Sequence, residues 1–408
     1  MIRAELPERE NWREQAEAVG FGFHEMYGEP YWTDGACYLF TLEEIERDIE
    51  EPTEAVHEMC MDLVGEVVER PDLLERLAIP SEHHDLVRRS WVEGDRHLYG
   101  RFDFAFDGTG PAKMLEYNAD TPTSVFETAW FQHGWLTDQI ESGWLPPNAD
   151  QFNLLQETLI EAFGTFPVPG PGGPLGGGGA PIFHFACAMD NDEDRGTATY
   201  LMDCAVQAGH VVDMLDVRDI GVSPDGEFTD KQDRTIDRCF KLYPWEDMLR
   251  EPFAKHLAPG VFVEPAWKAI LSNKAMLPLL WERNEGHPNL LPAYFEDDSR
   301  GGRLERAVSK PFHSREGENV TVLEAGRAVE AAEGDYDGPR IVQAFAPLYE
   351  KAGAHAVVGS WMVADRACGL GMREDASRIT RDLSRFVPHA IVDDPYAVAE
   401  RLASAGTA

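Results

Sequence analysis

Residues 101–118, RFDFAFDGTGPAKMLEYN, combine charged and amide side chains at spacings that suit metal or phosphate chemistry. Side chains alternate between the two faces of a strand. In the first half, three phenylalanines therefore point one way while Arg101 and Asp103 point the other. In the second half, Glu116 and Asn118 share a face. The Asp, Gly and Pro residues between the halves predict a hairpin with a loop of about four residues.

If Asp103 pairs with Glu116, then Arg101 pairs with Asn118, and the four polar groups cluster with Cβ atoms about 5 Å apart across the strands. Two adjacent carboxylates repel each other unless a cation lies between them, and oxygen ligands suit Mg²⁺. Arg101 would then hold a phosphate or an oxyanion. An ordinary solvent-facing hairpin explains the same residues, and the pattern alone does not decide. The small hydroxyl residues in the following NADTPTS favour a ligand site.

Composition predicts a folded protein with a large core and about two or three domains or lobes. Hydrophobic residues make up 43% of the 408-residue chain. The charged first residues do not resemble a signal peptide, and no apolar run approaches the roughly 20 residues of a membrane span, so we expect a cytoplasmic protein. The scattered cysteines predict buried thiols in a reducing compartment, at positions Cys37, Cys60, Cys187, Cys204, Cys239 and Cys368.

The net charge of −37 is unusually negative. Such a surface repels nucleic acid and anionic lipid, so we expect neither as a partner. A polycationic substrate and a general adaptation to a salty cytoplasm both explain the acidity. The charge does not choose between them, and assembly into a homodimer stays open.

The chain reads as a mixed α/β protein. Helical spacing dominates residues 11–95, with Thr41 as a helix N-cap, and returns at 127–145 and 150–166. The Gly/Pro-rich segment 164–181 has no G-K-[ST] ending and predicts a flexible surface loop. From 181 a strand–helix–strand pattern predicts a small α/β lobe. Short strands and helices are expected to alternate from 263 to 395.

Several motifs together resemble one known family. They are RFDF…LEYNADTPTS, YGEPYW near the start, KLYPWE (241–246), NKAMLPLLW (273–281), SKPFHSREGENV (309–320) and LGMRED (370–375). In this order they are similar to the glutathionylspermidine synthase family, and most of all to its shorter members that contain the synthetase alone. The resemblance implies a circularly permuted ATP-grasp fold with a pre-ATP-grasp-like α/β lobe.

The resemblance also implies a division of the chain. The expected parts are a helical N-terminal segment (1–99), the metal hairpin with its helices (100–163), the flexible loop (164–181), an α/β substrate lobe (182–262), the nucleotide-binding lobes (263–395) and a C-terminal tail (396–408).

Matched position by position, the family's functional residues fall on the motifs. Those implied for magnesium, with two ions expected, are Asp103, Glu116 and Asn118, and the catalytic arginine is Arg101. Those implied for ATP are Arg101, Lys274, Lys310, Arg315, Gly317, Gln343 and Arg373. Those implied for the substrates are Thr121, Thr123, Glu193, Asp194 and Glu246. Threonines replace the family's serines after the metal strand, and DNDED also reads as an ordinary solvated loop, so the substrates are the less certain part of the match.

The implied activity is ATP- and Mg²⁺-dependent ligation of a peptide- or glutathione-like acid to a polyamine- or amino-acid-like amine through an acyl phosphate. Three alternatives stay open. A phosphotransferase would share the ATP site, a binding module would hold nucleotide without turnover, and a glycosidase would use the paired carboxylates without nucleotide.

Overall fold

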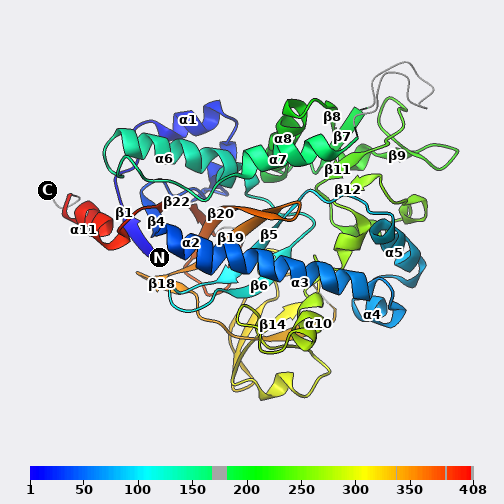
Figure 1. Cartoon of the computed structure of the whole chain (residues 1–408). Helices are drawn as coiled ribbons and strands as arrows, with labels where there is room; N and C mark the ends of the chain where they lie inside the picture. Colours follow the sequence, from blue (N-terminus) through cyan, green and yellow to red (C-terminus); the bar gives the residue numbers. More distant parts are fainter. Residues whose placement is uncertain (168–181, 337, 382–383, 406–408) are drawn as a thin grey trace.

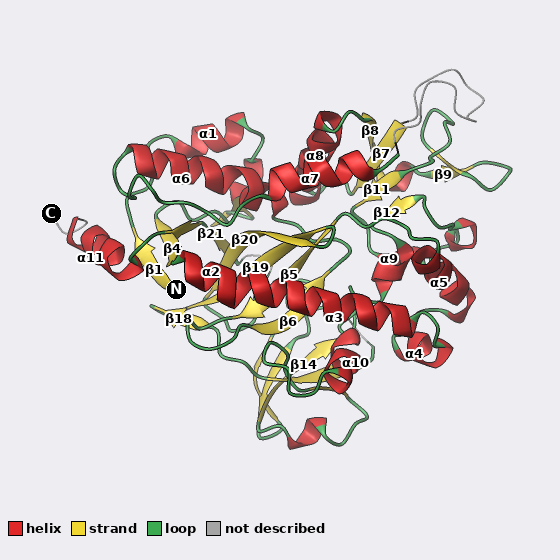
Figure 2. Cartoon of the chain, in the orientation of Figure 1, coloured by secondary structure: helices red, strands yellow, loops and turns green. Residues whose placement is uncertain are grey.

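The computed structural model describes residues 1–167, 182–336, 338–381 and 384–405. It is a mixed α/β fold in which a central antiparallel sheet is flanked by a small parallel sheet and a second antiparallel sheet (Figure 1). Helices cover the central sheet on both faces (Figure 2). The expected flexible loop lies largely outside the described residues, and its first residues, 164 and 165, belong to a helix.

The central sheet contains the hairpin that the sequence singled out. Its strand order is β21-β20-β19-β5-β6, with β18 also paired to β19. The strands are β5 (Tyr99–Ala105), β6 (Lys113–Asn118), β18 (Tyr349–Lys351), β19 (Ala354–Val363), β20 (Arg366–Asp375) and β21 (Arg385–Val387). The expected register is confirmed, since Arg101 pairs with Asn118 and Asp103 with Glu116. The loop runs from 106 to 112 and is longer than expected, because Phe106 and Ala112 are buried in the core instead of extending the strands.

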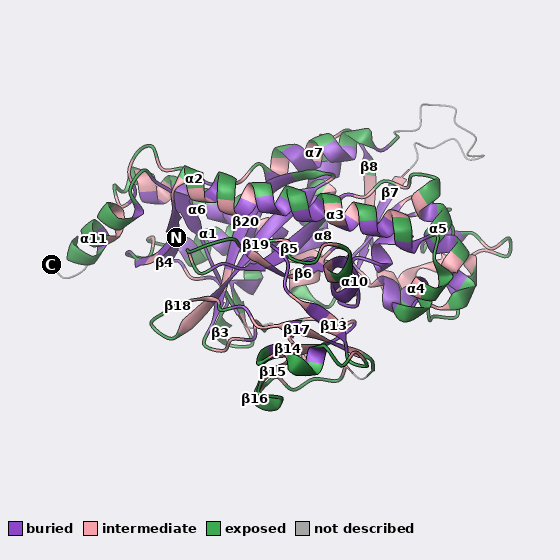
Figure 3. Ribbon diagram, turned by 60° about the horizontal axis from the view of Figure 1, so that its bottom comes forward, coloured by how far each residue is buried: buried purple, intermediate pink, exposed green. Residues whose placement is uncertain are grey.

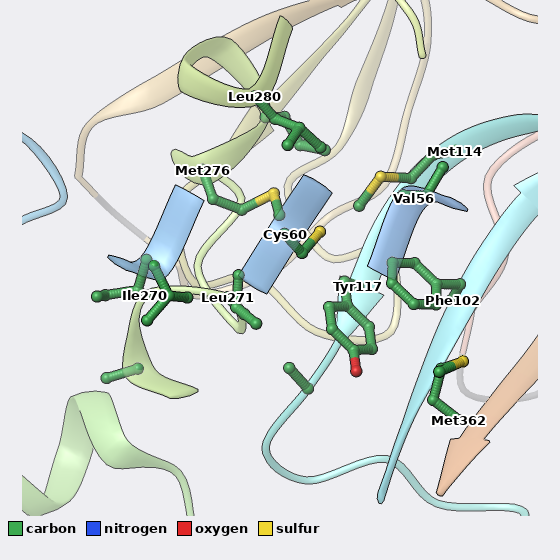
Figure 4. Packing of buried hydrophobic residues seen from close by; sticks show 14 of the residues in the cluster. Val56, Cys60, Phe102, Met114, Tyr117, Ile270, Leu271, Met276, Leu280 and Met362 are labelled. Atoms are coloured by element: carbon green, nitrogen blue, oxygen red, sulfur yellow. The ribbon is translucent and has the colours of Figure 1, made fainter. Parts of the chain in front are cut away.

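The apolar face of the hairpin packs against the long helix α3 (Glu51–Val67). The ring of Phe102 stacks on Tyr117 with centroids 3.7 Å apart. Val56 and Cys60, four residues apart on one side of the helix, lie over these rings (Figure 4). Because this face is buried, the polar face of the hairpin is turned to the opposite side of the sheet.

The predicted strand–helix–strand unit is confirmed. Strand β7 (Ile182–Cys187) is followed by helix α8 (Asp192–Gln207) and by β8 (Val211–Asp216), which runs parallel to β7. The sheet continues through β11 (Cys239–Lys241) and β12 (Phe262–Val263), in the order β12-β11-β7-β8. Helix α7 (Leu155–Thr165) packs against α8 and against the central sheet.

The expected alternation of strands and helices from 263 to 395 is wrong beyond helix α10 (Met276–Arg283). The described residues that follow form a second antiparallel sheet, ordered β13-β17-β14-β15-β16. Its strands are β13 (Ala293–Phe295), β14 (Arg306–Pro311), β15 (Thr321–Glu324), β16 (Arg327–Ala331) and β17 (Arg340–Ala344). The segments between turns are too short for a stable helix, so they pair with one another through hairpins.

The N-terminal segment is helical as expected, with α1 (Trp12–Ala18), α2 (Leu42–Ile45), α3, α4 (Pro71–Arg76) and α5 (His84–Val92). Thr41 caps α2 in a reciprocal capping box with Glu44. The segment also supplies strands that the sequence did not reveal. Strands β1 (Ile2–Glu5) and β4 (Ala36–Phe40) form a sheet with the distant β22 (His389–Ile391).

The remaining described elements connect these layers. Helix α6 (Gln132–Glu141) follows a π-helical turn, η4 (Glu127–Phe131), and the expected C-terminal tail is mostly helix α11 (Pro395–Ala405). The two-stranded pairs are β2 (Glu25–Met26) with β3 (Glu29–Pro30) and β9 (Gly221–Val222) with β10 (Phe228–Thr229). The short helix α9 (Trp245–Met248) follows β11.

All six cysteines are buried free thiols, as the sequence predicted. Burial follows the layers, with buried residues concentrated on the central strands and on the inward sides of the helices (Figure 3). Within the described ranges, no helix combines the length and the apolar character that crossing a membrane requires.

Candidate active site

The polar face of the hairpin is organised around Arg101. Its Nε and Nη2 atoms donate to the two carboxylate oxygens of Asp103 at 2.7 and 3.1 Å. Its Nη1 atom donates to the carbonyl oxygen of Thr123 and to the hydroxyl of Ser124, both at 3.0 Å. Arg101 is only 6% exposed and Asp103 only 8%. A buried, doubly bonded guanidinium–carboxylate pair of this kind holds both side chains in a fixed orientation.

Asn118 lies between the two acidic side chains. Its Nδ2 atom is 3.3 Å from Asp103 Oδ2 and 3.3 Å from Glu116 Oε1. Glu116 also pairs with Lys274, whose Nζ atom is 3.0 Å from Oε2. In the described part of the chain no group of three or more acidic, His or Cys side chains is arranged as a metal site. The set here is different, with two carboxylates and one amide whose nitrogen faces them. The carboxylate oxygens, joined by the amide oxygen if the amide group turns over, fit a hard cation that shares its ligands with phosphate.

Two glycines open space beside this cluster. Gly359 pairs with Asp103 across the sheet, and Gly371 pairs with Gly359, so both lie on the polar face. A Cβ atom at Gly359 would come within 3.0 Å of the Arg101 side chain, and one at Gly371 within 2.9 Å of Thr128 Oγ1. The absence of side chains at these two glycines therefore lets the Arg101 side chain and the turn η4 lie directly against the backbone of the sheet. Arg373, two residues beyond Gly371 on β20, faces the same side.

Two buried lysines approach the carboxylates from the second antiparallel sheet and from the segment before α10. Lys310 on β14 donates from Nζ to the Leu115 carbonyl and to Gln343 Oε1, both at 2.9 Å. Gln343 in turn donates to the Met114 carbonyl at 3.1 Å. These bonds tie β14 and β17 to the edge strand β6, so both sheets form the walls of one site.

The charges in this site strongly affect one another. Burial alone would raise the pKa of Glu116, but the ammonium groups of Lys274 and Lys310 outweigh it and lower that pKa to about 2. Burial lowers the pKa of Lys310 to about 8, against the attraction of Glu116. Cations that lie so close together in a buried site are well suited to hold a polyanion.

A cleft opens between the two sheets at this point. Part of its lining is the charged cluster. The rest is mostly apolar and includes Phe345, Leu348 and Ile379, with the guanidinium of Arg378 5.8 Å from the centre of the Phe345 ring. The remaining lining residues are Leu115, Val308, Gly317, Val320, Val322, Gln343, Ala344, Ala346, Val357, Arg378 and Thr380. An apolar slot that ends in lysines and carboxylates suits a planar base with a phosphate tail.

The loop after β14 borders this cleft. Gly317 has φ of +69°, and a Cβ atom there would lie 2.3 Å from the carbonyl oxygen of Thr380. Its neighbour Arg315 forms an ion pair with Glu246 at the start of α9 and donates to the Tyr336 hydroxyl at 3.5 Å. The loop thus connects the cleft to the parallel sheet.

The candidate substrate residues gather at the carboxyl ends of adjacent parallel strands. Glu193 and Asp194 follow β7, and Glu246 follows β11. The chain order reverses between these two strands, and ligands of open α/β sheets bind at such a point. Burial, followed by the nearby carboxylates of Glu193 and Glu316, raises the pKa of Asp194 to about 7. A half-buried acidic group of this kind is not typical of the solvated loop that the DNDED run also allowed.

Thr121 and Thr123 are half-buried on the loop that follows β6, and Thr123 contributes its carbonyl oxygen to Arg101. The same loop carries Asp120, which the sequence reasoning missed. Its buried carboxylate pairs with Lys241 and accepts a hydrogen bond from the backbone N–H of Trp245 at 2.9 Å. The KLYPWE motif is thereby fixed to the loop that follows the β5–β6 hairpin.

A second missed group is Glu127, which is fully buried on η4 and accepts a hydrogen bond from Tyr31 at 2.7 Å. Tyr31 lies within the YGEPYW motif. The YGEPYW motif marked Tyr31 as a residue of interest. Its sequence gave no indication that Tyr31 contacts Glu127, which lies almost a hundred residues later in the chain.

Comparison with known proteins gives a consistent result. A family described as "Glutathionylspermidine synthase preATP-grasp" matches residues 3–392. A putative acid–amine ligase of Haemophilus influenzae is 39% identical over 401 residues, which cover 95% of this chain and 98% of that protein. Trypanothione synthetase of Crithidia fasciculata is 27% identical over 80% of this chain. The bifunctional glutathionylspermidine synthetase/amidase of Escherichia coli is 24% identical over 93% of this chain. The matched regions make up only 52% and 63% of these two longer proteins.

A solved structure of a glutathione synthetase-like effector from Globodera pallida superposes with a TM-score of 0.52. The two are 12% identical, and the match covers 86% of this chain and 88% of the effector. This likeness concerns the fold alone. The match over residues 3–392, together with the bacterial relative of nearly equal length, assigns the chain to the glutathionylspermidine synthase family.

Proposed function

We propose that this protein is an ATP- and Mg²⁺-dependent acid–amine ligase that forms an amide bond through an acyl phosphate and releases ADP. The observation that carries the proposal is the cleft between the two antiparallel sheets, whose apolar end leads to Lys274, Lys310 and the hairpin carboxylates. The family supports a ligase, since its named members are acid–amine ligases and synthetases. We further propose a cytoplasmic enzyme with a circularly permuted ATP-grasp arrangement. Its nucleotide lobes would lie in 263–395, its substrate lobe in 182–262, and the N-terminal segment would pack on this core.

In this proposal the adenine lies between the apolar side chains near Phe345, with Gln343 at the strand that borders it. Lys274 and Lys310 hold the phosphates, and the loop with Arg315 and Gly317 closes over them. Mg²⁺ would be held by Asp103, Glu116 and Asn118, and the family resemblance implies two ions. A bound ion would neutralise negative charge on the phosphates of ATP.

The acid substrate attacks the γ-phosphorus, and the resulting acyl phosphate is then attacked by the amine. Arg101 is placed next to the carboxylate cluster with its charge maintained by Asp103, so it can stabilise the oxyanion that develops at the acyl carbon. Arg373 lies on the same face of the sheet and adds positive charge there. Thr121, Thr123, Glu193, Asp194 and Glu246 surround the position of the organic substrates. The acids among them suit a cationic amine, as in the glutathione–polyamine pair named for the relatives.

One experiment tests the proposal and separates it from its alternatives. Release of ADP from Mg-ATP is followed with and without glutathione or short peptides, and with and without spermidine or amino acids. A ligase requires both an acid and an amine for full turnover. Turnover with a single alcohol would instead indicate a phosphotransferase, and nucleotide binding without turnover in any combination would indicate a binding module.

Two variants make the test specific to the site. Lys310→Met is expected to abolish turnover, because it removes a buried cation from the phosphate end of the cleft. Lys231→Met is the matched control, because Lys231 is 61% exposed and pairs only with a surface aspartate among its described contacts. Equal activity of the two variants would contradict the proposed nucleotide site.

A further inference from the structure

The turn η4 places a fully buried glutamate on the reactive face of the central sheet. Glu127 begins this π-helical turn, and the next residue, Thr128, donates its hydroxyl to the Ser124 carbonyl at 2.7 Å. Ser124 in turn accepts a hydrogen bond from Arg101. The side chain of Thr128 also fills the space above Gly371. Glu127 is therefore fixed to the same surface as Arg101, and π-helical turns are frequent at functional sites.

The two carboxylate oxygens of Glu127 differ in their surroundings. Oε1 accepts the hydrogen bond from the Tyr31 hydroxyl, whereas Oε2 is buried and has no hydrogen-bond partner among the described residues. Leaving a buried acceptor unsatisfied destabilises the folded state, so folded proteins rarely keep one without a use. A buried carboxylate oxygen without a partner can accept a hydrogen bond from an N–H donor of a ligand.

Charged groups from three other elements face Glu127. Tyr31 comes from the segment after β3, Glu193 from the first turn of α8, and Arg373 from β20. Burial, followed by the negative charge of Glu193, raises the pKa of Glu127 to about 8, although Tyr31 and Arg373 oppose the shift. Such a pKa lies near the pH at which a general base is most effective. Glu193 itself is half-exposed, so its carboxylate lies nearer to solvent than the buried Glu127.

We propose that Glu127 binds the ammonium group of the amine substrate and accepts the proton that it must lose before it attacks. The proposal rests on the ligase function above and assigns a catalytic residue that the sequence motifs did not provide. One N–H bond of the ammonium breaks and its proton passes to Oε2 of Glu127. The freed lone pair of the nitrogen then attacks the acyl carbon. The C–O bond to the phosphate breaks, and the phosphate leaves with the second proton of the nitrogen.

The test separates attack by an ammonium from attack by a neutral nucleophile. Hydroxylamine is uncharged at neutral pH, so it can trap an acyl phosphate without prior loss of a proton. In Glu127→Gln we expect amide formation with spermidine to fall by about 10²–10⁴-fold, while hydroxamate formation from the same acid stays close to wild type. The exposed Glu141→Gln is the matched control and should retain both activities.

Equal loss of hydroxamate and amide formation in a folded Glu127→Gln variant would overturn the proposal, and so would full retention of both. If the wild-type enzyme yields neither product with any acid tested, the proposed function fails first, and the two failures are thus distinguishable. Melting temperature and circular dichroism establish that each variant is folded.

A second variant gives a readout that a purely structural role would not move. The Tyr31 hydroxyl stabilises the ionised form of Glu127, so Tyr31→Phe raises the pKa of that carboxyl. The acidic limb of the pH–rate profile for amide formation is expected to shift to higher pH in Tyr31→Phe, with no such shift for hydroxamate formation. An unchanged acidic limb, or the same shift in both reactions, would contradict the role of Glu127 as the proton acceptor.

Discussion

Replacing Arg101 with lysine is the most informative single change in the proposed active site. Lysine keeps the positive charge next to Asp103 but loses the planar fork that binds both carboxylate oxygens and reaches Thr123 and Ser124. Alanine is a poorer choice. It would leave Asp103 buried without its partner, and breaking a buried pair in this way destabilises by about 3–5 kcal/mol.

The expected effect follows from the contacts. Loss of one oriented donor to a developing oxyanion costs about 3–4 kcal/mol of transition-state stabilisation, or about 10²–10³-fold in kcat. ATP affinity should change much less, because Lys274 and Lys310 remain to hold the phosphates. Steady-state ADP release gives kcat, and equilibrium titration with a non-hydrolysable nucleotide gives the affinity.

Two outcomes for the Arg101→Lys variant would refute this reasoning. Near-normal kcat in a folded Arg101→Lys variant would show that a diffuse charge suffices and that the guanidinium geometry has no catalytic role. A large loss of nucleotide affinity with unchanged kcat would instead place Arg101 in ground-state phosphate binding.

Three further predictions concern the nucleotide cleft. Asp103→Asn should weaken Mg²⁺-dependent nucleotide binding, and unchanged affinity across a magnesium titration would count against its role as a ligand. Burial lowers the pKa of Lys310 to about 8, so its charge is present below that pH and lost above it. The affinity of the wild-type protein for nucleotide should therefore fall as the pH rises past about 8. The Lys310→Arg variant should lack this transition. Gly317→Ala should raise the KM for ATP several-fold, because the added Cβ would collide with the Thr380 carbonyl. The left-handed backbone at this position also disfavours alanine by about 1–2 kcal/mol. An unchanged KM would show that the loop does not close on ATP.

The hairpin could be predicted because its chemistry is local. The alternation placed Phe102 on one face of its strand and Arg101 and Asp103 on the other, and the pairing of Asp103 with Glu116, which the sequence offered as a condition, is the one that the structure has. The strand–helix–strand unit from 182 to 216 was equally clear, since an apolar strand and a helical repeat follow each other directly.

Other features depend on distant partners and left no local pattern. Every residue of β4 is buried, so its sequence shows no alternation, and its partner β22 lies about 350 residues further along the chain. Glu127 within a helical run reads as a surface residue, because only the folded chain brings Tyr31 to it. Beyond α10, short segments pair antiparallel with each other, and the sequence of a single segment does not indicate which other segment it pairs with.

The pair of Asp120 and Lys241 has a mechanical consequence. Each of the two residues is only 1% exposed, and the pair joins the loop after β6 to the end of β11. Separating these two charges would leave each of them buried without its partner, so we expect the parallel sheet and the β5–β6 hairpin to move together. The second antiparallel sheet is held to β6 by the hydrogen bonds of Lys310 and Gln343, and it can move relative to the hairpin only when those bonds break. In the proposed reaction, ATP would enter beside this second sheet, while the acid and the amine meet against the hairpin and the parallel sheet.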